Sequence, residues 1–455
     1  MYKKFAIYIL LYILTGGIVL SVFFLTPKEN NDLPFIRLII ITFATILLIK
    51  YFIYMFVSPW HDVLVSLKKY KSKGMSLTRR VYEPKVSVLV PTWNEGEGLI
   101  TTIMTLLESS YKNMEIIVVD NVSTDDTEKN VKSLIRKYER TIRPGIPYIK
   151  IFYVKEKKQG KGYALNHGID ASTGEIIVSI DADCYVPKNT IKNFVDYFRD
   201  SKVMATVGNV KIGNIHTFLG VVQYLEFLFS FYFKKNDSTL GSIYIIGGAA
   251  GAFRREVFEE LGGYSVSNIT EDIDLSVRIQ NAGMKIVYAQ DAIVYTEGAV
   301  DFAGLIKQRL RWKRGRFETF LKYRSLFFST DKKHNKVLSW IVLPLAVFGD
   351  MQLSFELFFI IFLYVYSYIT NDFSSFISGI IIVSSMFIVQ IISDENKKSW
   401  GNLIFLAPIG WLILYISTFI EFSALIKTFI GYLRGEEVKW QIWDRKGVFL
   451  KKAEN

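Results

Sequence analysis

Four short apolar runs between residues 86 and 181 constrain the fold of this chain more than any other feature. They read VSVLVPT, EIIVVD, IKIFYV and EIIVSID. Near-continuous runs of this kind are typical of parallel strands buried on both faces of a sheet. Segments with helical spacing separate them: Leu99 to Ser109, Asp125 to Tyr138 and Gly162 to Ala171. The alternation predicts an α/β domain with a mainly parallel sheet over residues 85–300.

Long apolar segments precede this region. Phe5 to Leu25 contains 21 residues without a charge, which is enough for a helix to cross a bilayer core of about 30 Å. Phe35 to Val57 follows directly. A signal peptide fits poorly, because the first run is too long and no small-residue cleavage site follows it. Residues 1–58 are therefore predicted to form a transmembrane hairpin, and residues 59–84 a basic linker on the cytoplasmic side.

Apolar segments return after the central region. They are Val337 to Ile369, Phe376 to Ile392 and Leu403 to Leu433. We predict an interfacial helix over 301–336, two to four transmembrane helices within 337–433, and a basic cytoplasmic tail over 434–455. The chain is thus expected to be a multi-pass cell-membrane protein with its α/β domain in the cytoplasm.

The charge balance and the scarcity of Cys and His limit the kinds of site. The formal net charge is +12, from 55 Lys and Arg against 43 Asp and Glu, which suits an anionic partner such as nucleic acid, lipid headgroups or a phosphorylated substrate. Nucleic acid is disfavoured, because the basic residues gather near the apolar segments. A single cysteine, Cys184, and four His exclude an intrachain disulfide and a Cys-rich metal centre. Carboxylates must hold any bound metal.

Acidic and amide side chains follow three of the predicted strands. Asn94 and Glu95 follow the first strand, Asp120 ends the second, and Asp181 and Asp183 follow the fourth. Ligands of open parallel sheets bind outside the carboxyl ends of the strands. Asp and Asn also begin ordinary turns, but their repetition on three strands favours a binding site. The pair in SIDADCY suits Mg²⁺ or Mn²⁺ on a diphosphate, because such ions take oxygen ligands and keep substrate phosphates in their shell.

Two common nucleotide-binding motifs are missing from the sequence. TWNEGEGLI has Thr101 where the dinucleotide fingerprint requires a third glycine. QGKGYAL lacks the residues that a P-loop requires around Gly160 and Lys161. The glycine cluster GGAAGAF, from Gly247 to Phe253, either lets backbone approach a ligand or forms a tight turn.

Two predicted helices carry further candidate side chains. Thr270 is predicted to cap a helix over Asp272 to Asn281, whose first-turn carboxylates serve either as capping charge or as catalytic groups. The apolar helix Thr217 to Phe233 carries aromatic residues that face the core or the membrane, or stack on a sugar; the first two readings are favoured.

The stretch KQRLRWKRG forms two faces if it is helical. Gln308, Arg311, Trp312 and Gly315 fall on one side, and Arg309, Lys313 and Arg316 fall on another. A basic cluster near apolar segments is usually a membrane-surface anchor, and we assign that role to the second set alone.

These motifs occur in an order that resembles a known family. PTWNE, Asp120 in VVDN, GKGYALNHG, DAD, GGAAGAFRR, TEDIDL and QRLRW are similar in order to those of membrane-integral, processive family 2 glycosyltransferases. Bacterial poly-N-acetylglucosamine synthases are most similar, with cellulose and hyaluronan synthases further away. The resemblance covers Lys85 to Gly315 and implies the GT-A fold of nucleotide-sugar transferases. Cys184, Thr296 and Glu297 depart from the pattern.

The resemblance also implies residue roles. The donor-binding residues would be Glu95, Asp120, Lys161, Asp181, Asp183 and Arg311. Asp120 would bind uridine, Lys161 would lie near the uridine and diphosphate, and Asp183 would hold the metal. Asp181 would contact the nucleotide-sugar, and Arg311 would face the diphosphate.

On the acceptor side, Asp272 would be the general base, and Glu271, Gln308 and Trp312 would bind the acceptor. Trp312 would stack under the acceptor sugar, and Gln308 would hold the site's shape. A single displacement by the deprotonated acceptor hydroxyl would invert the anomeric centre.

The predicted function is therefore transfer of a sugar, with UDP-N-acetylglucosamine as the candidate donor, to a growing polysaccharide that is exported through the membrane helices. Transfer of one sugar to a lipid acceptor is the first alternative, and a non-catalytic nucleotide-sugar-binding scaffold is the second. The expected partners are a UDP-sugar, an oligosaccharide or polysaccharide and the lipid bilayer. Whether a small accessory membrane subunit is needed, as in some relatives, is left open.

Overall fold

The computed structural model describes residues 53–67, 82–144, 148–394 and 403–435. The chain divides into two compact units. The sheet unit comprises Arg80–Phe227, Gly241–Leu345 and Ser423–Asn455. The second unit comprises Met1–Arg79, Leu228–Leu240 and Ala346–Phe422. The predicted transmembrane segment Phe5 to Leu25, most of Phe35 to Val57, and most of the basic linker and tail lie outside the described residues.

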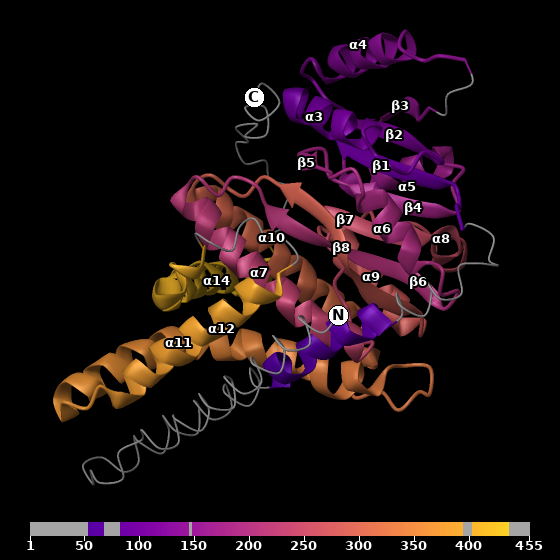
Figure 1. Cartoon of the computed structure of the whole chain (residues 1–455). Helices are drawn as coiled ribbons and strands as arrows, with labels where there is room; N and C mark the ends of the chain where they lie inside the picture. Colours follow the sequence, from indigo (N-terminus) through magenta and orange to yellow (C-terminus); the bar gives the residue numbers. More distant parts are fainter. Residues whose placement is uncertain (1–52, 68–81, 145–147, 395–402, 436–455) are drawn as a thin grey trace. The chain divides into compact units, whose positions relative to one another are not determined.

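An eight-stranded sheet forms the centre of the sheet unit (Figure 1). Its strands are β1 (Val86–Thr92), β2 (Met114–Asn121), β3 (Lys150–Glu156), β4 (Ile176–Ile180), β5 (Cys184–Tyr185), β6 (Val203–Ile212), β7 (Ala250–Arg254) and β8 (Lys285–Thr296). They lie in the order β3-β2-β1-β4-β7-β6-β8-β5. The four predicted strands are β1 to β4, which pair in parallel and form the parallel half of the sheet. β7 runs antiparallel to both of its neighbours, and β6 and β8 are parallel to each other. The sheet is therefore mixed, and mostly parallel as predicted.

The prediction that all four runs are buried on both faces is wrong for β3. Every residue of β1, β2 and β4 is buried, whereas none of β3 is fully buried. The reason is its position, because β3 lies at the edge of the sheet and pairs only with β2. Charged residues such as Lys150 and Lys155 suit such an edge, since they oppose pairing with another chain.

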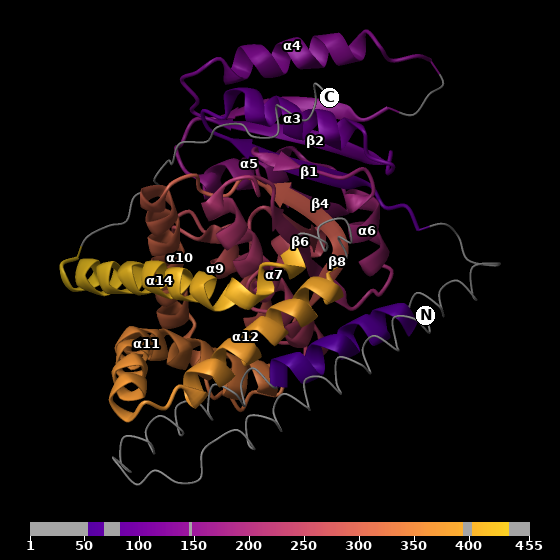
Figure 2. The same ribbon diagram turned by 60° about the vertical axis from the view of Figure 1, so that its left-hand side comes forward.

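Helices connect the parallel strands as the sequence predicted. α3 (Gly96–Leu107) and α4 (Thr127–Glu139) join β1 to β2 and β2 to β3, and they lie side by side (Figures 1 and 2). α5 (Lys161–Ala171) returns the chain from β3 to β4 and packs on β1 and β2. Right-handed crossovers place helices on opposite faces when the strand order reverses direction. The reversal at β1 and β4 is the position where ligands bind in such sheets.

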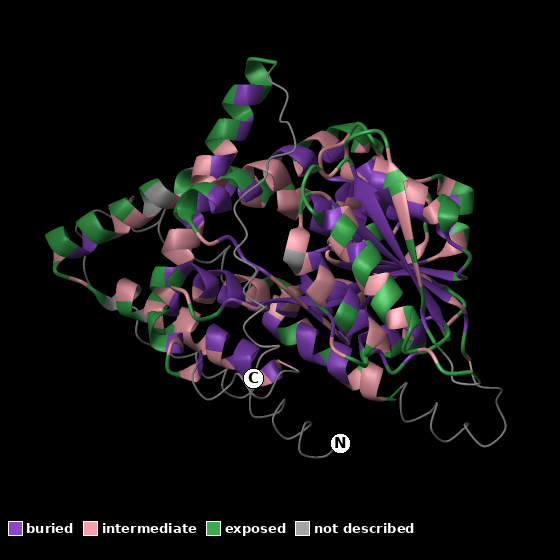
Figure 3. Ribbon diagram, turned by 90° about the horizontal axis from the view of Figure 1, so that it is seen from above, coloured by how far each residue is buried: buried purple, intermediate pink, exposed green. Residues whose placement is uncertain are grey.

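The remaining helices of the sheet unit follow the parallel half. They are α6 (Thr190–Tyr197), the first part of α7 (Phe218–Thr239), α8 (Arg255–Leu261), α9 (Glu271–Asn281) and α10 (Phe302–Lys322), with a 3₁₀ turn at Arg324–Leu326 and a π-helical turn at Leu338–Val342. Figure 3 shows that the central strands are buried, while the outer turns of the helices are exposed. α7 is longer than predicted, and Tyr224 in it is buried, which confirms the core reading for that ring.

The second unit is helical where the structure describes it. Residues 53–67 form one helix, and the last part of α7 also belongs to this unit. Most of α11 (Leu343–Thr370) and α12 (Ser374–Ser393) complete it. Met55, Tyr232, Met386 and Val389 form its buried apolar cluster. The buried Lys235 ammonium lies 3.0 Å from a carboxylate oxygen of Asp62. The predicted linker thus begins as helix, because the helix continues through residue 67.

One helical segment in the described part of the chain is long and apolar enough to cross a membrane. It is Ala407–Leu433, which contains a 3₁₀ turn at Ala407–Ile409 and α14 (Gly410–Leu433). Apolar stretches in the preceding helices are shorter: Leu338–Leu353, Ile360–Thr370 and Gly379–Ser393. The number of membrane crossings stays a prediction.

Candidate active site

The carboxyl ends of β1, β2 and β4 meet at one edge of the sheet. Thr92 pairs with Asp120 across β1 and β2. Leu89 pairs with Ser179 across β1 and β4, so Asp181 emerges from β4 at nearly the same level. The predicted gathering of acidic residues at this edge is therefore what the strand register produces.

Asp120 is held rigidly at the end of β2. One of its carboxylate oxygens accepts a hydrogen bond from the Ser123 backbone N–H at 2.9 Å, and the other accepts from the Tyr153 hydroxyl at 2.5 Å. Only 3% of Asp120 is exposed. Burial, followed by the hydrogen bond and charge of Asp120, raises the pKa of Tyr153. The phenol therefore stays protonated and remains a donor that orients the carboxylate.

The loops after β1 and β2 are tied together beside Asp120. Asn94 accepts a hydrogen bond from the Thr124 backbone N–H at 2.7 Å, and its own N–H donates to the Ser123 hydroxyl at 3.0 Å. Asn94 and Val122 both have positive φ angles, 54° and 62°, and a β-branched residue rarely adopts that conformation. Glu95 follows at the N-cap position of α3 without a side-chain capping bond. The loop that carries Glu95 is thus fixed to the loop that follows Asp120.

Lys161 lies at the centre of an acidic cluster. Its Nζ is 2.5 Å from Oδ1 of Asp181 and 3.6 Å from Oε1 of Glu271, although these residues are 20 and 110 positions away in sequence. Burial alone would lower the pKa of Lys161, but Asp181, Glu271 and Asp272 raise it by more. The ammonium therefore stays charged. It begins α5 after Gly160, whose φ of 141° is accessible mainly to glycine.

Burial strongly perturbs the carboxyl group of Glu271. Burial raises its pKa to about 7, against the opposing effect of Lys161; Asp272 raises it further and Arg311 lowers it. Glu271 is thus poised between its neutral and charged forms near neutral pH.

The raised pKa predicts a pH-dependent stability. Between the ordinary value of 4.5 and about 7, the unfolded chain loses the Glu271 proton while the folded chain keeps it. The free energy of unfolding should therefore fall as pH rises through that window, by roughly 1–3 kcal/mol from this group. In Glu271→Gln the decline should be smaller. Thermal unfolding of both proteins from pH 4.5 to 8 tests this, and parallel curves would contradict it.

Asp272 faces the glycine cluster. Its Oδ2 accepts a hydrogen bond from the Gly248 backbone N–H at 2.8 Å. A Cβ on Gly248 would lie 2.7 Å from Nζ of Lys161 and 3.4 Å from Oδ2 of Asp272, so a larger residue here would displace the Lys161 ammonium. Thr270 occupies the N-cap position of α9 as predicted, but its side chain does not cap the helix. Its hydroxyl donates to Asn268 instead.

Asp183 is buried beyond the end of β4. The Thr296 hydroxyl donates to its Oδ2 over 3.3 Å, and the Cys184 thiol lies 3.8 Å from Oδ1. No group of three or more His, Cys, Asp or Glu side chains that could hold a metal occurs in the described part of the chain. This donor set fits Mg²⁺ or Mn²⁺, which are held by one or two carboxylates together with water and substrate phosphates. It does not fit a metal enclosed by protein ligands alone.

α10 carries the three predicted residues of QRLRW. Gln308 is buried, and its Oε1 has no hydrogen-bond partner in the described structure. The Trp312 ring is 6.3 Å from the Phe227 ring of α7. In the described part of the chain no hydrogen bond or ion pair joins Gln308 or Trp312 to the Lys161 cluster, whereas Arg311 acts electrostatically on Glu271. The structure therefore brings together Lys161, Asp181, Glu271 and Asp272.

The predicted anchor role of Arg309 is wrong. Only 4% of Arg309 is exposed, and its guanidinium lies 2.8 Å from Oε2 of Glu226 in α7. The guanidinium also lies over the Trp312 ring, 4.3 Å from its centroid. The assignment failed because α7 covers this side of α10, which the helical spacing alone cannot reveal. Arg309 instead supports the ring of Trp312.

Replacing Arg309 with Met should destabilise the protein. The substitution leaves the carboxylate of Glu226 without its buried cation and removes the contact with Trp312, a loss of about 2 kcal/mol. Thermal unfolding of the purified protein measures this, with Lys313→Met on the next turn as a control. Unchanged stability together with loss of membrane association would restore the anchor interpretation.

Three residues of the site were not identified from the sequence. Tyr153 was not identified, although β2 pairs with β3 so that Asp120 lies opposite Lys155. Tyr153, two residues before Lys155, therefore lies on the same face of the sheet as Asp120. The N–H of Gly248 gave no signal beyond the glycine cluster. Tyr264 is buried, and its pKa is raised by burial, then by the charges of Glu271 and Asp272. Its location near the cluster depends on contacts between residues that are far apart in the sequence.

Comparisons with known proteins agree with this geometry. The sequence model described as "Glycosyltransferase like family 2" matches residues 84–315. A poly-beta-1,6-N-acetyl-D-glucosamine synthase of Staphylococcus epidermidis is 26% identical over 378 residues, 80% of this chain and 88% of that protein. A probable glycosyltransferase of Bacillus subtilis is 28% identical over 73% of this chain and 71% of its own length.

A solved structure shares the fold. It is a mannosyltransferase from Pyrobaculum calidifontis in complex with GDP-Man and Mn²⁺, which superposes with a TM-score of 0.51 at 21% identity. The match covers 85% of this chain and 99% of that one. The fold of the sheet unit is therefore of the GT-A type.

Proposed function

Since this chain belongs to glycosyltransferase-like family 2, we propose that it is a membrane-bound, inverting enzyme that transfers a sugar from a UDP-sugar to a growing polysaccharide. The observation that carries the proposal is the cluster in which the charged Lys161 contacts Asp181 and Glu271 next to Asp272. One cation among carboxylates at the ends of parallel strands suits a donor that brings a diphosphate and a metal.

The donor side of the proposal rests on Asp120, Lys161, Asp181 and Asp183. Asp120, oriented by Tyr153 and Ser123, would accept the N–H of the uracil ring. Lys161 and Arg311 would exchange part of their contact with the carboxylates for the diphosphate oxygens. Asp183, with Asp181 beside it, would hold Mg²⁺ or Mn²⁺, and the bound ion would neutralise charge on the leaving diphosphate. Glu95 would complete the donor side from the loop after β1.

The acceptor side of the proposal rests on Asp272. Its carboxylate, fixed by the Gly248 N–H, would take the proton of the acceptor hydroxyl as that oxygen attacks the anomeric carbon. Trp312 would stack on the acceptor sugar, and Glu271 and Gln308 would bind it. The unpaired Oε1 of Gln308 is suited to accept a sugar hydroxyl. Attack by the acceptor itself, in one displacement, inverts the anomeric centre.

A polysaccharide acceptor is favoured by the relatives. The Staphylococcus epidermidis proteins similar to this chain are named as synthases of poly-beta-1,6-N-acetyl-D-glucosamine, and UDP-N-acetylglucosamine is therefore our candidate donor. Attachment to a bilayer is supported by the Ala407–Leu433 segment. Export of the product through the membrane helices belongs to the same proposal. The cytoplasmic location of the sheet unit and the six-part division of the chain are part of the same proposal.

The function is tested by reconstituting the full chain in lipid with Mg²⁺ or Mn²⁺ and a panel of labelled UDP-sugars, and then sizing the products. The expected result is a long polymer from one UDP-sugar, with activity lost in chelator and restored by the metal. Transfer of only one sugar per acceptor under excess donor would contradict polymer synthesis and favour the lipid-acceptor alternative. Absence of transfer from every UDP-sugar would contradict the proposal.

A further inference from the structure

One face of α10 carries two sets of residues. Positions 308, 312, 315, 319 and 322 follow one another at spacings of four and three, so at about 100° per residue they form a single stripe. Gln308 and Trp312, at the start of the stripe, are the proposed acceptor-binding residues. Gly315, Thr319 and Lys322 continue it toward the end of the helix.

Gly315 touches the segment that carries Asp272. A Cβ on Gly315 would lie 2.0 Å from Oγ1 and 2.5 Å from Cγ2 of Thr270, far inside any permitted contact. Thr270 is two residues before Asp272 and is itself buried. The backbone of α10 therefore approaches the start of α9 as closely as only glycine allows.

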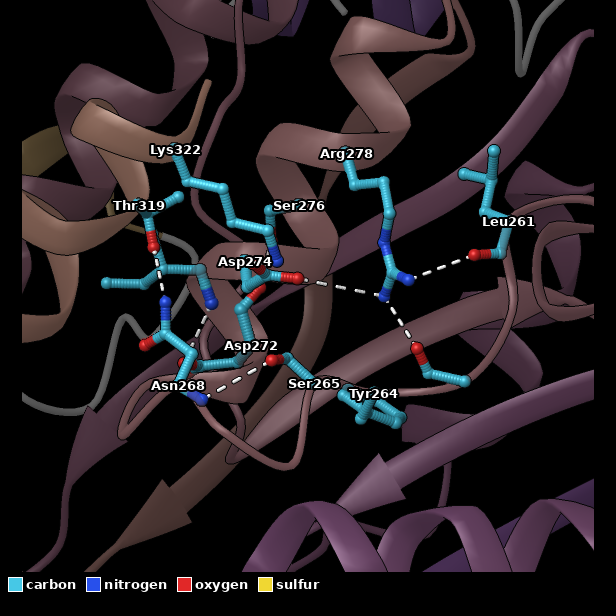
Figure 4. A network of polar contacts seen from close by, with 12 residues as sticks. Leu261, Tyr264, Ser265, Asn268, Asp272, Asp274, Ser276, Arg278, Thr319 and Lys322 are labelled. Atoms are coloured by element: carbon cyan, nitrogen blue, oxygen red, sulfur yellow. Dashed lines mark hydrogen bonds and ion pairs between the residues drawn. The ribbon is translucent and has the colours of Figure 1, made fainter. Parts of the chain in front are cut away.

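Two polar contacts extend this interface along α10 (Figure 4). Asn268 donates from Nδ2 to the hydroxyl of Thr319 at 2.9 Å and accepts the Thr270 N–H at 2.9 Å. The ammonium of Lys322 lies 2.6 Å from Oδ1 of Asp274. Asp274 and Thr319 have no exposed surface. The face formed by Gly315, Thr319 and Lys322 is thus in contact at every turn.

Asp272 and Asp274 face in different directions. Residues i and i+2 of a helix point about 200° apart, so the carboxylates of Asp272 and Asp274 contact different neighbours. Asp272 receives the Gly248 N–H, and Asp274 receives Lys322. Helix α9 therefore joins the catalytic cluster on one side to α10 on the other.

From these contacts we infer that the C-terminal half of α10 sets the distance between the base Asp272 and the acceptor-binding residues of QRLRW. Gly315, Thr319 and Asp274 are positioning residues: they touch no substrate, and they fix the helix that carries Gln308 and Trp312 against the segment that carries the base. The inference rests on the proposed function, because it takes Asp272 as the base. It accounts for the glycine at the end of QRLRWKRG and the threonine that begins TEDIDL, since the two are in contact.

The test compares Gly315→Ala with the double variant Thr270→Gly/Gly315→Ala in the full chain. A methyl group at 315 should displace α10 and lower kcat by about a hundredfold, because an error of about 1 Å in alignment costs that much. The Kd for UDP, measured by calorimetry, should change by less than about twofold. Removing the Thr270 side chain makes room for the methyl group, so the double variant should regain at least about tenfold in kcat relative to Gly315→Ala. Thr270→Gly alone is the reference.

Gly379→Ala, in the apolar helix α12, is the matched control. A Cβ there meets nothing within 4 Å, so its kcat should equal that of the wild type. If Gly315→Ala fails to fold, Thr319→Val decides the matter. It keeps the side chain's shape, loses the bond to Asn268, and should lower kcat by about tenfold at unchanged UDP affinity.

Two outcomes overturn the inference. One is a kcat near that of the wild type in Gly315→Ala or, where that protein does not fold, in Thr319→Val. The other is a double variant no faster than Gly315→Ala, because the lost activity would then not come from the contact with Thr270. A role in stability alone would lower the unfolding temperature without lowering kcat in folded protein. If the wild type transfers no sugar, the proposed function fails and this inference fails with it; an active wild type with an equally active Gly315→Ala removes only the inference.

Discussion

Asp272→Asn is expected to lower kcat by about a thousandfold, since removal of a general base costs roughly 10²–10⁴ in rate. The amide keeps the size of the carboxylate, and its oxygen can still accept the Gly248 N–H that now reaches Oδ2 at 2.8 Å. The fold should therefore change little, although one negative charge beside Lys161 and Glu271 is lost. The Kd for UDP should remain close to that of the wild type, because Asp272 is assigned to the acceptor and not to the nucleotide.

Steady-state kinetics on the reconstituted protein and calorimetry with UDP give the two quantities. Asp170→Asn, an exposed carboxylate of α5, is the matched control and should leave both unchanged. Transfer that survives in Asp272→Asn would show that another group takes the proton. Loss of both UDP binding and transfer would place Asp272 on the donor side instead.

Lys161→Met is expected to affect both donor affinity and stability. Methionine fills most of the volume but leaves Asp181 and Glu271 without the ammonium that lies 2.5 and 3.6 Å from them. Loss of one member of a buried ionic cluster costs about 3–5 kcal/mol, because the remaining charges stay buried without compensation. The Kd for UDP should rise by at least about tenfold, since a charge-assisted bond to the diphosphate is lost.

Thermal unfolding and calorimetry measure the two effects, and Lys161→Arg separates charge from shape. Arginine keeps the cation and should recover most of the stability, while its larger head should recover less of the affinity. Wild-type affinity for UDP in Lys161→Met would mean that this lysine serves only to neutralise the acidic cluster. The proposed donor role would then be wrong.

The parallel half of the sheet could be predicted from the sequence because its signal is local. Runs rich in Val and Ile between amphipathic helices identify β1, β2 and β4 to within about one residue. The central strand β7 has no such signal. Its sequence, Ala250–Arg254, is part of a glycine cluster, and it becomes a strand because β4 and β6 lie on either side of it.

Only the acidic residues at the carboxyl ends of the parallel strands could be predicted to lie together in the site. The register of β1, β2 and β4 brings Asp120 and Asp181 to one edge, as parallel strands require. The contact of Lys161 with Glu271 joins residues 110 positions apart, and no periodicity encodes it. Arg309 shows the same limit, because its burial depends on Glu226 in a helix 83 residues earlier.

The order of the strands along the chain has a consequence for synthesis of the protein. β1 to β4 pair only with one another until β7 adds to β4, so the parallel half is complete in sequence by residue 180. Domains tend to fold from the N-terminus as they leave the ribosome, and local pairings form fastest. Asp120, Lys161 and Asp181 should therefore be in place before Asp272 and α10 emerge. β7 then joins the two halves of the sheet, and the enzyme is complete only after Asp272 and α10 have followed it.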